Sequence, residues 1–426
     1  MAHERADYHD ERALLMQILK GRRIALCVSA SVSAYKALDI VSLLRKLGAH
    51  VRVAMSAEST KFLSPLLFEA LSHEAVLHDE AQSWADGGLN PIALARWAEV
   101  LLVAPATANT INKIASGIAD SALLHTVLAF SGKILIAPAA NTTMLESPIT
   151  RQSLEKLRTL GIEIIPTQEK ILACGEFGDG ALADSQEIVW RTARALLCED
   201  FWHNRPACIS GGGSVEKIDD VRYLSNFSSG KMAQNLAAAL YLKGANVCLV
   251  HSNLAAPFSA FALKTLPQSL QHEHAQSAAE FLQKLQGWID SQSAEPLPYL
   301  FMAAAISDYR PENAASGKRK KSEIGQSWNL QCVQTPDILA TLRKEGICAI
   351  GFKLESAQDA LQNARNALAQ KNLDAICLNT LQDAPFGSES NSIAFVTARE
   401  CTHFEPSHKL LQSFCILDSA KRLHDG

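Results

Sequence analysis

The chain has 426 residues, of which 48% are hydrophobic and 20% charged, with a formal net charge of −4 at pH 7. This length allows two or three domains, and the composition excludes a disordered chain, while the small net charge gives no reason to expect nucleic-acid binding. No apolar run reaches about 18 residues, the charged N-terminus has no signal-peptide core, and the ten cysteines show no metal spacing, so we expect a cytoplasmic protein without a membrane span.

Short apolar segments alternate with helical ones through the first half. Residues 23–28 (RIALCV) predict a buried strand, and apolar residues then recur with helical spacing from Ala37 to Leu47. Gly48 ends that helix, and residues 50–55 (HVRVAM) predict the next strand. EVLLVA, KILIAP and IEIIPT predict three further strands. Strands that alternate with helices indicate a parallel sheet.

The second half repeats this pattern. KLGAHVRVAMS (46–56) and LKGANVCLVHS (242–252) are similar helix–turn–strand units, one in each half. The chain therefore predicts an α/β protein with two doubly wound, Rossmann-like parallel-sheet domains, in which ligands bind beyond the carboxyl ends of the strands. We expect an N-terminal extension (1–20) that is a solvated helix or a disordered tail, a first domain (21–195), a linker (196–206) and a second domain (207–426).

Polar and glycine-rich segments follow two strands of the second half. Strand 207–210 leads into Gly211, Gly212 and Gly213, which suit either a flexible turn or a loop that approaches a phosphate. The cluster of polar residues in VRYLSNFSSGK favours the second interpretation, because an anion needs donors at a helix N-terminus. Strand YLFMAAA ends near Asp308 and precedes GKRKK, which is either a solvated basic loop or part of the same site.

DDVRYLSNFSSGKM, AAAISDYRP, GKRKK, TPDIL, GFKLE and KNLDAI make the region 205–400 resemble the phosphopantothenate–cysteine ligases. The resemblance implies that CTP, with Mg²⁺, activates the carboxylate of 4′-phosphopantothenate as an acyl-cytidylate, and that the amine of cysteine then displaces CMP. It also implies catalytic roles for Lys318, Asn226 and Arg222. The nucleotide-binding residues implied are Gly211, Gly212, Gly213, Ala304, Ala305, Asp308, Phe352 and Lys371. Ser214-Val215 stands where the family usually has Thr-Arg.

SASVSAYK, APATANTINKIASGIAD, PAANTTM and ACGEFGDG make residues 20–190 resemble the flavin-dependent cysteine decarboxylases, including phosphopantothenoylcysteine decarboxylase. This implies a flavodoxin-like fold that holds FMN and decarboxylates phosphopantothenoylcysteine. Asn141 then corresponds to the residue that holds the substrate carboxylate and Cys174 to a proton donor. A cysteine is more commonly a small buried residue, but the ACG context favours the catalytic role here. The FMN-binding residues implied are Ser29, Ser31, Ser56, Pro105, Ala106, Thr107 and Asn109.

The first half departs from this family at several positions. Ala140 replaces a methionine, and Ala181 stands where an arginine is common. In LNPIALARWAE, Pro91 stands at the position of the essential active-site histidine. Proline has no proton to exchange, although it is a good first residue for a helix. The nearby histidines are interpreted as structural or exposed: His73, His78 and His125.

Two main functions remain open from the sequence. The chain is a bifunctional enzyme of both activities, or a ligase whose first half is an inactive flavin-fold platform or a regulatory binding module. A generic Rossmann dehydrogenase is disfavoured because no G-x-G-x-x-G follows the first strand. The resemblance further implies a homo-oligomer, with trimers of the first half and dimers of the second that together form a dodecamer.

Overall fold

A computed structural model describes residues 18–85, 87–252, 257–260, 262–320, 326–355, 359–380 and 387–424. The expected N-terminal extension lies outside these residues except for its last three. The chain forms two compact units. The first ends at Leu197 and the second begins at Cys198, except that residues 262 and 263 group with the first. Within the described residues, no helix has the length and apolar character needed to cross a membrane.

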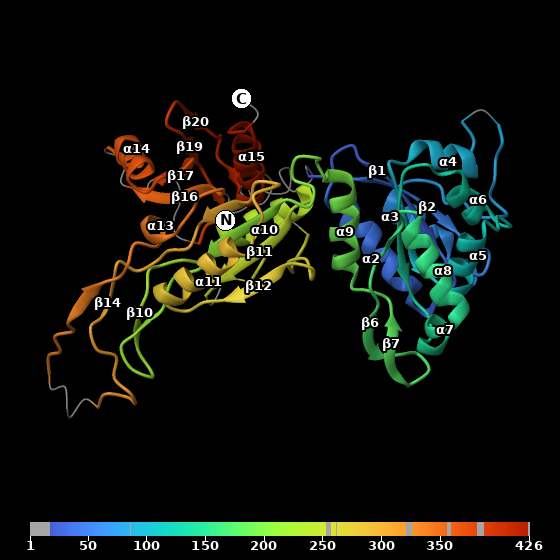
Figure 1. The fold of residues 1–426 in the computed structure, drawn as a ribbon. Coiled ribbons are helices and arrows are strands. Elements are labelled where there is room, and N and C mark those ends of the chain that lie inside the picture. The colour runs from blue at the N-terminus through green and yellow to red at the C-terminus, as the bar shows by residue number, and fades with distance from the viewer. Residues whose placement is uncertain are drawn as a thin grey trace, which may run out of the picture. The chain divides into compact units, whose positions relative to one another are not determined.

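The first unit, coloured blue to green in Figure 1, is built on a five-stranded parallel sheet. The order of its strands is β2-β1-β3-β4-β5. This is the flavodoxin order, in which the chain reverses direction across the sheet between β1 and β3. The prediction of a doubly wound parallel sheet is confirmed here. The strands are β1 (Arg23–Val28), β2 (His50–Met55), β3 (Val100–Ala106), β4 (Lys133–Pro138) and β5 (Glu163–Ile164).

Helices cover both faces of this sheet. Alternate residues of β1 and β3, such as Ala25 and Leu101, pack against α4, α5, α6 and α8, while α2 and α9 pack together on the other side. The helices are α2 (Lys36–Lys46), α3 (Pro65–Ser72), α4 (Pro91–Trp97), α5 (Ala108–Ser116), α6 (Ala122–Ala129), α7 (Thr142–Glu146), α8 (Pro148–Thr159) and α9 (Ser185–Leu197). A hairpin of β6 (Gln168–Ile171) and β7 (Phe177–Ala181) lies outside the sheet.

The strand expected in IEIIPT is shorter than the apolar run. Only Glu163 and Ile164 form β5, although the Ile165 amide still donates to the carbonyl of Ile136 at 2.8 Å. Pro166 follows, and it has no N–H with which to continue the ladder.

The second unit has an eight-stranded sheet with the order β12-β11-β8-β13-β16-β17-β19-β20. The pairing is parallel from β12 to β17, and it becomes antiparallel for β19 and β20. The segment SIAFVT contains β19, which runs antiparallel to β17. The strands are β8 (Pro206–Gly211), β11 (Asn246–His251), β12 (Gln271–His274), β13 (Tyr299–Met302), β16 (Cys348–Glu355), β17 (Ala375–Thr380), β19 (Ala394–Val396) and β20 (Cys401–His403).

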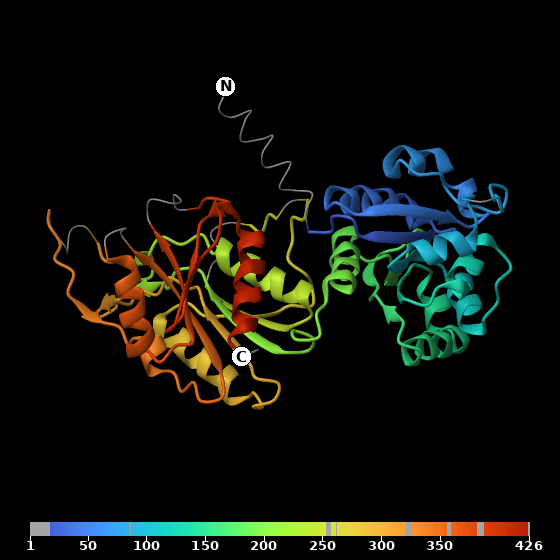
Figure 2. The ribbon, with the colours of Figure 1, turned by 90° about the horizontal axis from the view of Figure 1, so that it is seen from above.

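Helices again cover both faces. One face packs against α11, α13 and α14, and the other against α10, which lies beside α15, the red helix of Figure 2. The helices are α10 (Lys231–Lys243), α11 (Ala278–Asp290), α13 (Ile338–Thr341), α14 (Ala360–Gln370) and α15 (Lys409–Arg422). Short pairs complete the unit: β9 (Glu216–Lys217) with β10 (Tyr223–Leu224), β14 (Tyr309–Pro311) with β15 (Cys332–Gln334), and β18 (Ser390–Asn391) with β21 (Ser407–His408).

Candidate functional site

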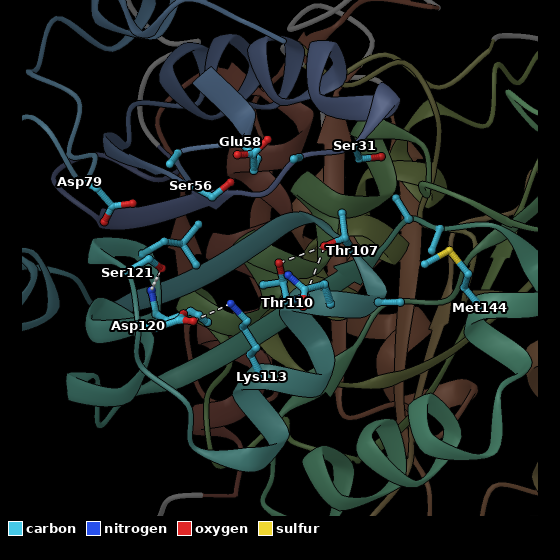
Figure 3. Close-up of a pocket in the computed structure, with 18 residues that line it drawn as sticks. Ser31, Ser56, Glu58, Asp79, Thr107, Thr110, Lys113, Asp120, Ser121 and Met144 are labelled. Atoms are coloured by element: carbon cyan, nitrogen blue, oxygen red, sulfur yellow. Dashed lines mark hydrogen bonds and ion pairs between the residues drawn. The ribbon is translucent and has the colours of Figure 1, made fainter. Parts of the chain in front are cut away.

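A cavity of about 570 Å³ lies at the carboxyl ends of the first sheet (Figure 3). Its walls come from the loops after β1, β2, β3 and β4 and from α5 and α6. Ligand pockets typically enclose about 300–1,000 Å³, and in this topology they lie at the switch point between β1 and β3. Of the expected FMN residues, four line the cavity: Ser31, Ser56, Thr107 and Asn109.

The other three expected FMN residues lie behind this wall. The buried Ser29 hydroxyl donates to the Pro105 carbonyl at 2.7 Å and accepts from the Thr107 amide at 3.0 Å. Pro105 and Ala106 are buried within β3. Ser29 thus ties the β1 loop to the β3 loop, so that its contribution to the cavity is to hold the wall in place.

The N-terminus of α5 faces the cavity. The Thr107 side chain caps the helix by accepting from the Thr110 amide at 3.3 Å, and the two hydroxyls lie 3.0 Å apart. Lys113, one turn along, pairs with Asp120 at 2.7 Å (Figure 3), which lowers the pKa of the Asp120 carboxyl. Hydroxyls, a helix N-terminus and an ammonium group are donors that suit a phosphate.

Asn141 and Cys174 come together although they are distant in the sequence. The side-chain Nδ2 of Asn141 donates to the Cys174 sulfur at 3.4 Å, and the thiol in turn contacts a Glu176 carboxylate oxygen at 3.8 Å. Cys174 is exposed in the turn between β6 and β7, so the alternative of a small buried cysteine is wrong. Sequence reasoning did not single out Glu176, although it lies only two residues from the cysteine.

Pro91 is the first residue of α4, as its helix-start signal predicts. Asn90 caps the helix, because its side-chain oxygen accepts from the Ala93 amide at 2.8 Å. The Pro91 side chain is buried and lines a second cavity of about 520 Å³, which shares Asp79, Asp120 and Ser121 with the first.

In the second unit, the glycine loop is bonded to the segment that follows β13. The Gly212 carbonyl accepts from the Ala305 amide at 2.9 Å, and the Ser214 amide donates to the Ala305 carbonyl at 3.2 Å. A Cβ on Gly213 would lie only 2.8 Å from the Asn226 carbonyl oxygen. The Asn226 side chain itself donates to the Ile306 carbonyl at 2.9 Å. The loop, Asn226 and residues 304–306 therefore form one connected structure.

Arg222 is held by Asp219. Its Nε donates to Asp219 Oδ2 at 3.0 Å, and its Nη2 donates to the Arg319 carbonyl at 2.7 Å. Desolvation opposes ionisation of Asp219, but hydrogen bonds from the Val221 and Arg222 amides outweigh it and lower the pKa of this carboxyl to about 2. Arg222 thus connects its own loop to the basic segment, where Lys318 is exposed.

A cavity of about 280 Å³ lies between the start of α10 and the ends of β13, β16 and β17. Ala304, Ala305 and Phe352 line it, as the nucleotide assignment requires, together with Lys231, Lys353 and Lys409. The other expected nucleotide residues do not line this cavity. The glycine loop is connected to it only through its hydrogen bonds with Ala305. Asp308 is exposed, and Lys371 forms an ion pair with Asp337 at 2.9 Å.

Sequence reasoning missed Lys409, because it lies at the start of the last helix, far along the chain. Burial lowers the pKa of its ammonium group to about 8. It missed Asn379 and Asn391 as well, whose side-chain oxygens are buried and make no hydrogen bond. Within the described residues, no three His, Cys, Asp or Glu side chains converge on a metal position. Mg²⁺ commonly relies on substrate phosphates and water, so its binding stays a prediction.

The flavodoxin-order sheet, followed by a second sheet with its own glycine loop, defines a two-domain α/β protein. Residues 15–197 match the family model described as Flavoprotein, and residues 202–423 match the DNA/pantothenate metabolism flavoprotein C-terminal domain. The coenzyme A biosynthesis bifunctional protein CoaBC of Haemophilus influenzae is 32% identical over 88% of this chain and 91% of its own length. The CoaBC protein of Bacillus subtilis is 34% identical over 88% of this chain and 90% of its own length.

The chain belongs to this family of bifunctional coenzyme A biosynthesis proteins, in which a flavoprotein decarboxylase domain precedes a ligase domain. Among solved structures, a cysteine-to-serine mutant of PPC decarboxylase complexed with pantothenoylaminoethenethiol is 34% identical, with a TM-score of 0.38. The match covers 42% of this chain and 98% of the decarboxylase chain. A C-terminal domain of CoaBC is 24% identical, covers 53% of this chain and 99% of its own, and has a TM-score of 0.42.

Proposed function

We propose that the second unit joins 4′-phosphopantothenate to cysteine at the expense of CTP. The observation that carries this proposal is the connection of the glycine loop, Asn226 and Ala305 beside a cavity that three lysines line. Backbone amides and ammonium groups are the partners that a triphosphate needs. The acyl-cytidylate intermediate and the choice of CTP rest on the family resemblance.

The residues of this unit have separate tasks in the proposed reaction. The Gly213 backbone lies so close to the Asn226 carbonyl that this position has no room for a side chain. Exposed Lys318, on the segment bonded to Arg222, is free to approach the α-phosphate and stabilise the charge that develops there. Arg222 acts by holding that segment.

The test of the ligase is a direct assay. The purified chain, given CTP, 4′-phosphopantothenate, cysteine and Mg²⁺, should form phosphopantothenoylcysteine, CMP and pyrophosphate. Lys318→Ala should lower kcat by about 10²–10³-fold, the loss typical when one group that stabilises transition-state charge is removed. Lys284→Ala is the matched control, because this lysine of α11 forms an exposed ion pair with Glu273 of β12 and lines no described cavity. An unmodified chain that does not consume CTP would refute the proposal.

We further propose that the first unit holds FMN and decarboxylates phosphopantothenoylcysteine. The cavity fits the cofactor: its volume, the α5 N-terminus and the hydroxyls of Ser31, Ser56 and Thr107 suit a flavin phosphate. Bound FMN supplies reversible two-electron oxidation of the substrate. Asn141 orients the Cys174 thiol, and the exposed thiol holds the proton that the product requires. We also propose that the first unit forms trimers and the second forms dimers, which together build a dodecamer.

Flavin absorbance of the purified chain and CO₂ release from phosphopantothenoylcysteine test this second activity. We expect a yellow protein that releases CO₂, and Pro91→His should change the rate by less than about tenfold. If Pro91→His instead raises the rate by orders of magnitude, the first unit of the natural chain is the inactive platform.

A further inference from the structure

The cavity that Pro91 lines combines a mostly apolar wall with a few polar side chains. Its volume is about 520 Å³, and most of its wall is apolar, from Trp84, Pro91, Ile92 and Leu128. His125 also lines it. Of the described residues that line this cavity or the neighbouring FMN cavity, His125 alone carries an imidazole. A ligand that spans both cavities would therefore meet a single group of this kind.

Two hydrogen bonds position the helix that carries His125. The Ser121 side chain accepts from the Leu124 amide at 3.3 Å, and the Asp79 carboxylate accepts from the Ala122 amide at 2.6 Å. The His125 amide donates to the Ser121 carbonyl at 2.9 Å. Positions 121 and 125 lie one helical turn apart and so share a face. Because Ser121 lines both cavities, this face of α6 continues from one cavity to the other.

The charged groups around His125 are already engaged. Asp120 is paired with Lys113 of α5, and its pKa is lowered chiefly by that contact and to a smaller extent by His125. Asp79 caps α6 through one carboxylate oxygen. The residues of α4 that line the cavity, Pro91 and Ile92, carry no charge. Imidazole commonly acts as a general acid or base, so His125 is the acid–base candidate of the cavity that Pro91 lines.

We propose that His125 is the base that removes the proton from the thiol of the substrate in the first unit, which rests on the proposed decarboxylase function. The S–H bond breaks, the proton bonds to a ring nitrogen, and the charge stays on the sulfur. Asp120, whose carboxylate interacts electrostatically with His125, helps to balance the imidazolium that forms, and the substrate carboxylate is left to Asn141. The His125 side chain is exposed, so water takes up the proton afterwards.

The test compares His125→Gln with the unmodified chain, using phosphopantothenoylcysteine and following CO₂. The kcat/KM should fall by about 10²–10⁴-fold, the range for loss of a positioned acid–base group. The pH dependence of kcat/KM should also differ from that of the unmodified chain. Flavin absorbance and ligase activity should not change. His50→Gln is the matched control, since His50 is an exposed residue of β2 outside both cavities, and it should leave all four measurements unchanged.

A second measurement does not depend on turnover. In proton NMR, the His125 ring resonance, assigned by its loss in His125→Gln, should shift when the thiol 4′-phosphopantetheine is added, and should not shift with the analogue that lacks sulfur. A His125→Gln variant that keeps its rate within about twofold and its pH profile overturns the proposal. An unmodified chain that binds FMN but releases no CO₂ removes the decarboxylase function itself, and the role of His125 with it.

Discussion

In both units, several polar side chains beside the cavities hold the backbone in place instead of facing a ligand. Ser29 joins two loops through one hydroxyl, and Asn226 joins the segment before α10 to the end of β13. Residue types alone did not separate such supports from residues that face a ligand. Four of the expected FMN residues line the cavity, whereas the hydroxyl of Ser29 is turned toward backbone groups.

Gly213 offers a test at this scale. A Cβ there would lie 2.8 Å from the Asn226 carbonyl oxygen, and backbone cannot move aside as a flexible side chain can. Gly213→Ala should therefore raise the KM for CTP by at least about tenfold and lower the urea midpoint. Gly287→Ala in α11 is the matched control, because its Cβ would meet no atom within 4 Å. It should leave ligase kinetics unchanged and stabilise the helix by up to about 1 kcal/mol. Equal kinetics in the two variants would contradict this account of the glycine loop.

Helix starts supply the polar groups of the first unit. Thr107, Ser121 and Asn90 cap α5, α6 and α4, and each helix begins at the wall of one of the two cavities. The strand that precedes α5 and the proline that begins α4 were predictable, because apolar runs and turn residues are local signals. The cavity that each helix start faces was not predictable, because it depends on the order of the strands in the sheet.

The Asn90 cap can be tested through stability. Asn90→Ala removes the acceptor of the Ala93 amide and should destabilise the first unit by about 1 kcal/mol, measured as a lower urea midpoint. Asn90→Ser should keep most of that stability, because serine is also a good cap. If both variants unfold at the same urea concentration as the unmodified chain, the cap contributes nothing measurable.

At the scale of the whole molecule, the two proposed activities reside on separate sheets. Each unit has its own hydrophobic core and its own cavities at strand ends. All ten cysteines are free, so no disulfide bond joins the two units. We therefore expect that a change at one site leaves the chemistry of the other intact.

Cys174→Ser and Lys318→Ala test this independence. With CTP, 4′-phosphopantothenate and cysteine supplied, Cys174→Ser should accumulate either phosphopantothenoylcysteine or the decarboxylated enethiol that has not received its proton. Lys318→Ala should form neither compound. When phosphopantothenoylcysteine is supplied directly, Lys318→Ala should release CO₂ at the unmodified rate. A mixture of the two variants should restore the whole sequence of reactions, and a failure of that mixture would show that the units depend on each other.

The sequence by itself determined the two α/β units, most of their strands and the family, because these depend on local periodicity and on motifs that are continuous in the chain. It also identified Pro91 as a departure. Only the tertiary structure brought Cys174 to Asn141, Lys409 to the start of α10, and His125 to the cavity of Pro91. Each of these contacts joins residues that are far apart in the chain, and strand order and helix packing decide them, neither of which local sequence records.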